Sequence, residues 1–176
     1  MGSGKSTVGP LLAEALAWDF YDLDHRIESV IGMPIATFFK KEGEPAFRKV
    51  EREALWASES DNRTVIAVGG GALCNPDNLD WAKSHGTVVY LSVSIHALVK
   101  RLKAEQTTRP MLLGDDGQLL EDETVTARIA NLLESRLPLY EQSDLTIDTD
   151  GLRPIQIAQR LSLHFKKQPE TRNPKL

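Results

Sequence analysis

Apolar residues recur along this chain in two patterns, one with the period of a helix and one in short unbroken runs. Residues 5–17 carry apolar side chains at helical spacing, from Val8 to Leu16. Residues 64–68 (TVIAV) and 87–91 (TVVYL) are instead continuous apolar runs of strand length, as expected for strands buried on both faces. The chain is therefore predicted to alternate amphipathic helices with buried strands.

The same patterns predict the remaining elements. Further helices are expected at residues 25–31, 35–39, 44–58, 76–83, 95–103, 123–140 and 154–165, and short extended segments at 20–23 and 145–147. Residues 106–118 contain Pro110, two glycines and two aspartates, which is typical of a loop. Buried strands separated by helices predict an α/β fold, a doubly wound parallel sheet flanked by helices. Ligands of such folds bind beyond the carboxyl ends of the strands.

Length and composition limit the class of protein. The 176 residues suit one domain, predicted at 1–165, and the polar segment 166–176 (KKQPETRNPKL) is predicted to be a disordered tail. A net charge of -4 argues against nucleic-acid binding, and no apolar run approaches the roughly 18 residues of a membrane helix. The single cysteine, Cys74, is predicted to be a buried structural thiol, although a nucleophile is the alternative. These features favour a cytoplasmic protein, with a monomer as the default.

Residues 2–7 read GSGKST and match the second half of the phosphate-loop pattern. Small residues let backbone N–H groups approach phosphate oxygens, and the helix that follows directs its positive N-terminus toward them. In such a loop Lys5 would reach the β- and γ-phosphates of ATP, and the Ser6 hydroxyl would bind Mg²⁺. The alternative is a flexible Gly/Ser-rich start, which the amphipathic helix directly behind it disfavours.

The first glycine of the pattern, and the strand that normally precedes it, would fall before Met1. In this fold class that strand lies inside the sheet, so its neighbours are expected to be left unpaired. We therefore expect the natural start of the protein to lie upstream of Met1. This expectation bears on the activity of this chain more than on its family.

Two acidic residues, Asp22 and Asp24, follow a short extended run after the first helix. Alternate residues of an extended segment share a face, so both carboxylates are expected on one side. One could hold Mg²⁺, and the other could accept the proton of a substrate hydroxyl. The alternative is that Asp24 caps the helix predicted at 25–31.

Several basic residues and one glycine triplet complete the candidate site. Arg48 precedes Glu51 by three residues, which suits either a surface ion pair or an acid that orients an arginine toward a carboxylate ligand. Gly69, Gly70 and Gly71 follow a predicted strand and suit either a flexible turn or close approach to a ligand.

Two further arginines, Arg109 and Arg136, could either bind a ligand or have a role unrelated to function. Arg109 lies in the predicted loop, where it could close over ATP or simply be exposed. Arg136 lies near a helix end, where its charge could complement the helix dipole.

Taken together, these segments resemble the shikimate kinase family. The matching segments are GSGKST, FYDLD followed by Ile27 and Glu28, residues 32–53 (GMPIATFFKKEGEPAFRKVERE), VGGGA, TRPML and RLPLY. Their order and spacing match over nearly the whole chain except its tail. The resemblance implies transfer of the ATP γ-phosphate to the 3-hydroxyl of shikimate, in aromatic amino-acid biosynthesis. It also implies a P-loop kinase fold like that of nucleoside monophosphate kinases, with a mobile lid at about residues 106–120.

The resemblance implies a role for each matching residue. ATP would be bound by Gly2, Ser3, Gly4, Lys5, Ser6, Thr7, Arg109 and, near the adenine, Arg153. Mg²⁺ would be held by Ser6 and Asp22. Shikimate would be bound by Asp24, Arg48, Gly69, Gly70, Gly71 and Arg136, with the two arginines gripping its carboxylate. The catalytic residues would be Lys5, Asp24 as the base, and Arg109 from the lid.

Some positions depart from the family pattern, and other classes remain open. Leu23 stands where the family often has Ser or Thr, and this change is tolerable because side chains at alternate positions face away from the two aspartates. Met111 replaces the first leucine of RPLL, and this change is tolerable because Leu and Met have similar volumes. A gluconate kinase is the alternative enzyme, and adenylate kinase matches less well. A degenerate kinase-like binding module is the alternative that is not an enzyme.

Overall fold

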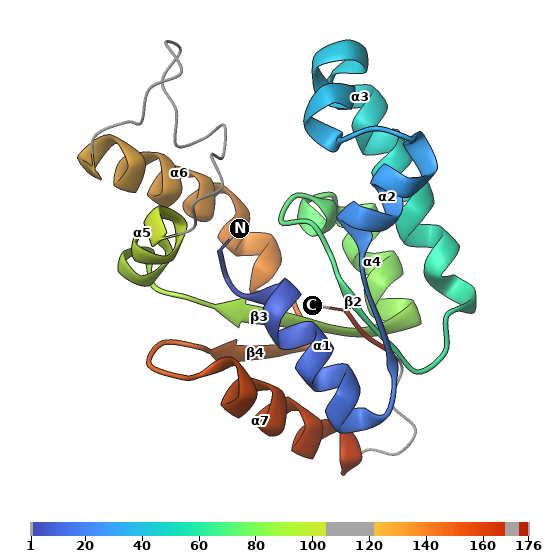
Figure 1. The fold of residues 1–176 in the computed structure, drawn as a ribbon, viewed down its shortest axis with the longest axis vertical. Coiled ribbons are helices and arrows are strands. Elements are labelled where there is room, and N and C mark those ends of the chain that lie inside the picture. Colours follow the sequence, from blue (N-terminus) through green and yellow to red (C-terminus); the bar gives the residue numbers. More distant parts are fainter. Residues whose placement is uncertain (1, 105–121, 168–172, 176) are drawn as a thin grey trace.

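The computed structural model describes residues 2–104, 122–167 and 173–175. The predicted lid and Arg109 lie outside these residues. The described chain forms one sheet with helices on both of its faces (Figure 1). Within this described part, no helix is long and apolar enough to cross a membrane.

The sheet of the described residues has five strands in the order β1-β2-β5-β3-β4, and each strand is parallel to its neighbours. The strands are β1 (Asp19–Asp22), β2 (Thr64–Ala67), β3 (Gly86–Ser92), β4 (Leu145–Asp148) and β5 (Asn173–Lys175). All four residues of β2 are buried, which fits a strand covered on both faces. The predicted α/β fold with a parallel sheet is confirmed.

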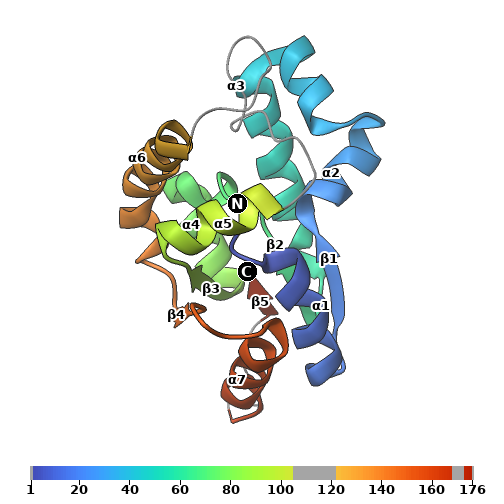
Figure 2. The ribbon, with the colours of Figure 1, turned by 60° about the vertical axis from the view of Figure 1, so that its left-hand side comes forward.

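The helices α1 (Lys5–Leu16) and α7 (Pro154–Lys166) lie together on one face of the sheet (Figures 1 and 2). Their buried side chains form one core cluster with Val65 of β2 and Val89 of β3. Val65 points to this face, and its neighbour Ile66 points to the other, because successive side chains of a strand alternate. The predicted helix at 5–17 is thus fixed against the sheet by its apolar stripe.

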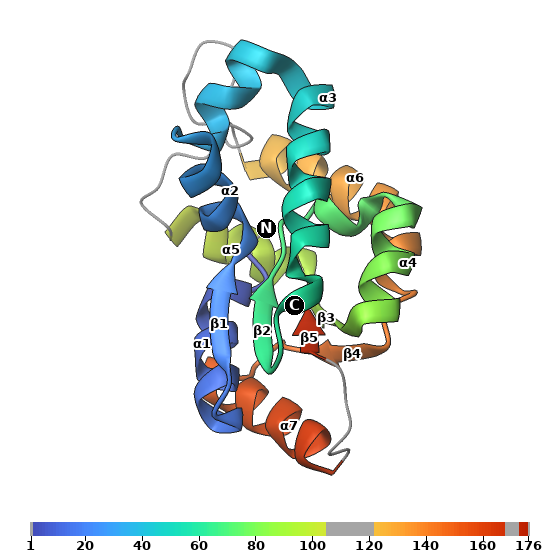
Figure 3. The same cartoon turned by 90° about the vertical axis from the view of Figure 1, so that its right-hand side faces the viewer.

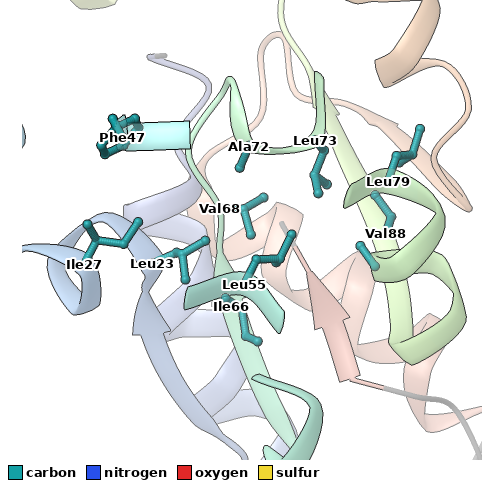
Figure 4. Close-up of a cluster of buried hydrophobic side chains, with 11 residues drawn as sticks. Leu23, Ile27, Phe47, Leu55, Ile66, Val68, Ala72, Leu73, Leu79 and Val88 are labelled. Carbon is teal, nitrogen blue, oxygen red and sulfur yellow. The ribbon is translucent and has the colours of Figure 1, made fainter. Parts of the chain in front are cut away.

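The opposite face carries a second cluster, in which Ile66 and Val68 meet Leu55 of α3 (Ile35–Trp56) and Leu79 of α4 (Pro76–His85) (Figure 4). The same cluster includes Leu23 and Ile27 of α2 (Leu23–Ile31). A third, smaller cluster joins α5 (Ile95–Ala104) to α6 (Asp122–Tyr140). Two short 3₁₀ helices, η1 (Ala57–Ser60) and η2 (Ala72–Cys74), complete the described elements.

The helix α3 covers two segments that the sequence predicts as separate helices, 35–39 and 44–58. Its backbone is broken at Gly43, which has φ 81° and ψ 171°. A positive φ of this size is accessible to glycine at little cost, and Pro45 suits the first turn of the helix that follows. The outer and inner parts of α3 are therefore two helical segments joined at Gly43 (Figure 3).

The strand β5 corrects two expectations. Part of the predicted disordered tail, Asn173–Lys175, is a strand, and it lies between β2 and β3 where an unpaired gap is expected (Figure 3). Lys175 is opposite both Ile66 of β2 and Val88 of β3. The physical reason is that facing edges of two buried strands carry N–H and C=O groups that need partners. The tail supplies them, although Pro174 has no N–H to donate.

Candidate active site

A cleft opens at the carboxyl ends of β1 and β2, the place predicted for a ligand of this fold. Its volume is about 640 Å³, which suits small-molecule ligands. The cleft is lined by Gly2, Gly4, Lys5, Ser6, Thr7, Asp22, Asp24, Ile35, Phe39, Phe47, Arg48, Glu51, Val68, Gly69, Gly70, Gly71 and Arg136. Nearly every residue that the sequence singles out is thus in one place.

The segment from Gly2 to Thr7 forms the turn into α1. Gly2 and Gly4 have φ values of 69° and 93°, in the region where a side chain would be strained. The Gly4 carbonyl accepts hydrogen bonds from the amides of Thr7 and Val8 at 3.0 and 2.8 Å, which starts the helix. Within the described residues no side chain caps this helix, so its N-terminus is open to an anion in the cleft.

Ser6 and Asp22 are joined across the cleft floor. The Ser6 hydroxyl donates a 2.7 Å hydrogen bond to Oδ2 of Asp22, which is the last residue of β1. These two oxygen ligands are the type that Mg²⁺ prefers, and Mg²⁺ commonly takes only one or two protein ligands besides water and substrate phosphates. The described residues contain no cluster of three or more His, Cys, Asp or Glu side chains for a metal. The pair therefore fits a magnesium ion shared with a nucleotide.

Asp22 also caps α2, since its Oδ1 accepts a 3.0 Å hydrogen bond from the Asp24 amide. The alternative in which Asp24 is the cap is therefore wrong, and the Asp24 carboxylate is left in the cleft. Burial raises the pKa of Asp24, the charge of Asp22 raises it further, and the charge of Lys5 lowers it. A carboxylate held in this way suits a proton acceptor.

Arg48 lies on the inner part of α3 and is held by two acids. Its guanidinium donates to Glu51 at 2.7 Å and to Glu44 at 3.1 and 2.9 Å. Burial raises the pKa of Glu51, and the hydrogen bond and charge of Arg48 oppose that rise. Since the Glu51 side chain is 3% exposed, the alternative of a solvated surface pair is wrong for it.

Two glycines of the triplet lie too close to neighbouring side chains to carry a Cβ atom. None of the three residues has a positive φ. A Cβ on Gly69 would lie 2.8 Å from Oδ1 of Asp24, and one on Gly71 would lie 2.8 Å from a guanidinium nitrogen of Arg48. The triplet therefore packs directly against the acid and the arginine of the cleft, and the flexible-turn alternative is not needed.

Arg136 comes to the same cleft from α6, one turn before Tyr140 at the end of that helix. The alternative of a helix-terminal charge fails because the last turn of α6 contains no basic residue. Tyr140 also belongs to this part of the structure, although the sequence pattern does not point to it. Its hydroxyl donates a 2.5 Å hydrogen bond to the Gly70 carbonyl. No local pattern could reveal this contact, since 70 residues separate the two.

Arg153 does not line this cleft; it is the N-cap of α7, where its backbone N–H and its side chain donate to Gln156. Its predicted place near the adenine stays a prediction. Cys74 is half-buried in η2, and burial raises the pKa of its thiol, which fits the predicted structural role better than a nucleophile.

Comparison with known proteins agrees with this geometry. A family model described as "Shikimate kinase" matches residues 1–165. The chain belongs to the shikimate kinase family. Among curated shikimate kinases, that of Chlorobium chlorochromatii is 39% identical over 170 residues, covering 97% of this chain and 89% of the relative. That of Chlorobaculum tepidum is 40% identical over 170 residues, covering 94% and 88%.

Solved shikimate kinases also match in structure. The enzyme from Bacteroides thetaiotaomicron superposes with a TM-score of 0.86 at 34% identity, over 94% of each chain. The enzyme from Acinetobacter baumannii, solved in complex with shikimate, has a TM-score of 0.82 at 34% identity and covers 97% of this chain and 90% of that one. The chain thus shares both the sequence and the fold of shikimate kinases.

Proposed function

We propose that this chain transfers the γ-phosphate of ATP to the 3-hydroxyl of shikimate. The observation that carries the proposal is the layout of the cleft. Five residues of the GSGKST turn line the same cleft as Asp24, Arg48 and Arg136. A triphosphate on the loop and a small hydroxy acid on the arginines would face each other, and positioning of this kind supplies much of the catalysis in phosphoryl transfer.

Each residue has a physical task in this proposal. The helix N-terminus and Lys5 bind the phosphates and offset charge on the transferring group. Asp24 accepts the proton of the attacking hydroxyl, and the guanidinium forks of Arg48 and Arg136 bind the carboxylate. Ser6 and Asp22 would hold Mg²⁺, which would supply charge neutralisation for the phosphates.

We also propose one functional domain at residues 1–165 with a lid at about 106–120, in which Arg109 covers ATP. Arg153 is assigned to the adenine end of the nucleotide. A cytoplasmic location and a monomeric state stay predictions.

A coupled assay of ADP release tests the proposal with shikimate, gluconate and quinate as acceptors. Turnover is expected with shikimate and should fall at least a hundredfold in Lys5→Ala, since loss of one preorganised charge donor costs about that much. Lys49→Ala is the control, because Lys49 is 79% exposed on α3 and does not line the cleft. Turnover with gluconate alone would assign another small-metabolite kinase, and no turnover with any acceptor would favour a binding module.

A further inference from the structure

The carbonyl groups of the glycine triplet all accept hydrogen bonds from the protein. Gly69 accepts from the Ala72 amide at 3.0 Å, and Gly71 accepts from the Cys74 amide at 3.1 Å. Gly70 accepts twice, from the Tyr140 hydroxyl at 2.5 Å and from the Cys74 thiol at 3.3 Å. These hydrogen bonds to its carbonyl groups therefore hold the triplet in place.

The amides of Gly70 and Gly71 differ from these carbonyl groups. In the part of the chain that the structure describes, neither the Gly70 amide nor the Gly71 amide donates to a protein acceptor. The Gly70 carbonyl and the Gly71 N–H belong to one planar trans peptide unit and point in opposite directions. Because Tyr140 and Cys74 hold the carbonyl, the Gly71 N–H points away from them, and Gly71 lines the cleft next to Arg48.

The surroundings of Tyr140 keep its hydroxyl group protonated and able to donate a hydrogen bond. Burial raises the pKa of its hydroxyl, so the proton stays in place at neutral pH. Its ring packs on that of Tyr90, with centroids 5.1 Å apart, which fixes the direction of the hydroxyl. Burial likewise raises the pKa of the Cys74 thiol, so the sulfur carries its weak donor proton.

We propose that Tyr140 is a positioning residue for the acceptor substrate, and that Cys74 assists it. Together they hold the Gly70–Gly71 peptide so that its N–H faces a substrate oxygen in the cleft. Tyr140 lies one turn after Arg136 on α6, so the same hydrogen bond also ties the helix that carries Arg136 to the triplet. This proposal rests on the proposed function for the identity of the substrate.

Tyr140→Phe tests the proposal by removing one oxygen atom. The KM for shikimate is expected to rise about tenfold, the effect of leaving one carbonyl without its hydrogen bond, while kcat and the KM for ATP stay within about twofold. Tyr90→Phe is the matched control, because it removes the hydroxyl of the neighbouring ring, whereas the Gly70 carbonyl accepts from Tyr140 and Cys74. Equal effects of the two changes, or an unchanged KM in Tyr140→Phe, would overturn the proposal.

Cys74 provides a second pair of variants that disturbs packing little. Cys74→Ser replaces the thiol donor by a hydroxyl donor and should leave the KM for shikimate near that of the parent. Cys74→Ala should raise it about two- to threefold, and more in the Tyr140→Phe background, where the thiol is the remaining donor to Gly70. Identical Ser and Ala variants would contradict a donor role for the thiol.

Amide NMR spectra of the protein without substrate separate this proposal from the proposed function. The Gly71 resonance should shift in Tyr140→Phe and stay in place in Tyr90→Phe, whether or not shikimate is phosphorylated. A Gly71 resonance that does not move in Tyr140→Phe overturns the positioning role. Absence of turnover in the parent protein, with the expected shift, overturns the proposed function alone.

Discussion

The guanidinium of Arg48 lies 2.7 Å from the carboxylate of Glu51, whose side chain is 3% exposed. A buried acid next to a half-exposed arginine holds the arginine in one direction, and Gly71 packs against the same guanidinium nitrogen that donates to Glu51. The arginine thus meets the cleft in a preorganised state, which lowers the entropy cost of binding a carboxylate.

Arg48→Ala should raise the KM for shikimate by about 10–100-fold, since hydrogen bonds to charged groups contribute roughly 1.5–3 kcal/mol. The KM for ATP should change little. Arg52→Ala is the control, because Arg52 lies one turn further along α3, pairs with Asp77 at 3.5 Å and does not line the cleft. An unchanged KM for shikimate in Arg48→Ala would show that the carboxylate binds elsewhere.

Two alanine substitutions in the glycine triplet should separate binding from chemistry. A Cβ at Gly69 meets the Asp24 carboxylate, so Gly69→Ala should chiefly lower kcat. A Cβ at Gly71 meets the Arg48 guanidinium, so Gly71→Ala should chiefly raise the KM for shikimate. Effects of about tenfold or more are expected, because sub-ångström misplacement of reacting groups is costly. The two variants control for each other, and identical kinetic changes would contradict the assigned roles.

Asp24→Asn should lower kcat by about 10²–10⁴, the usual effect of removing a general base. In the parent protein, kcat should fall as the pH drops through the pKa of Asp24, which burial and the charge of Asp22 raise. A profile of kcat against pH checks this. Asp80→Asn, on an exposed position of α4, is the control, and it should leave the profile unchanged.

The same raised pKa predicts an effect on stability. The folded protein holds the Asp24 proton more tightly than the unfolded chain, so stability falls as the pH rises from the ordinary aspartate pKa through the raised one. Above that window the ionised carboxylate costs stability. Asp24→Asn should therefore have a higher Tm than the parent at neutral pH, and this advantage should disappear below about pH 3.9. If the Tm advantage of Asp24→Asn instead grew toward acid pH, folding would lower the pKa of Asp24 rather than raise it.

Ser6→Ala should raise the Mg²⁺ concentration needed for half-maximal activity by about tenfold, and Ser6→Thr should keep it near the parent value, because phosphate loops use either hydroxyl. Titration of activity with Mg²⁺ after chelation checks this. The hydrogen bond from Ser6 to Asp22 is also lost in the alanine variant, so Tm is measured alongside. Equal Mg²⁺ requirements for the Ala and Thr variants would place the ion on other ligands.

Much of this architecture could be predicted from the sequence, because local signals agree with the fold. The TVIAV run becomes a fully buried strand, and the GSGKST turn opens α1 as expected. Spacing alone could not decide whether Arg48 and Glu51 form a surface pair, since burial of Glu51 depends on the packing of α3 against the sheet. The contact of Tyr140 with Gly70 is set by the placement of α6, which no local pattern encodes.

The strand β5 could not be predicted either, because residues 173–175 (NPK) have low strand propensity. Replacing Asn173, Pro174 and Lys175 by valines should raise Tm by roughly 5 °C, since β-branched residues favour the strand conformation and valine restores the N–H that Pro174 lacks. Lys166→Val with Lys167→Val is the control for added apolar character outside the strand. A Tm that stays level in the valine strand would mean that the segment is not seated between β2 and β3.

The break at Gly43 means that the wall of the cleft is made of two jointed pieces. Ile35 and Phe39 come from the outer piece, and Arg48 and Glu51 come from the inner one. Both pieces pack on the buried cluster around Ile66, the inner one through Leu55 and the outer one through Ile35 and Phe39. A substitution at Ile35 should therefore reshape the cleft on one side of the Gly43 joint and leave the Arg48–Glu51 pair on the other side intact.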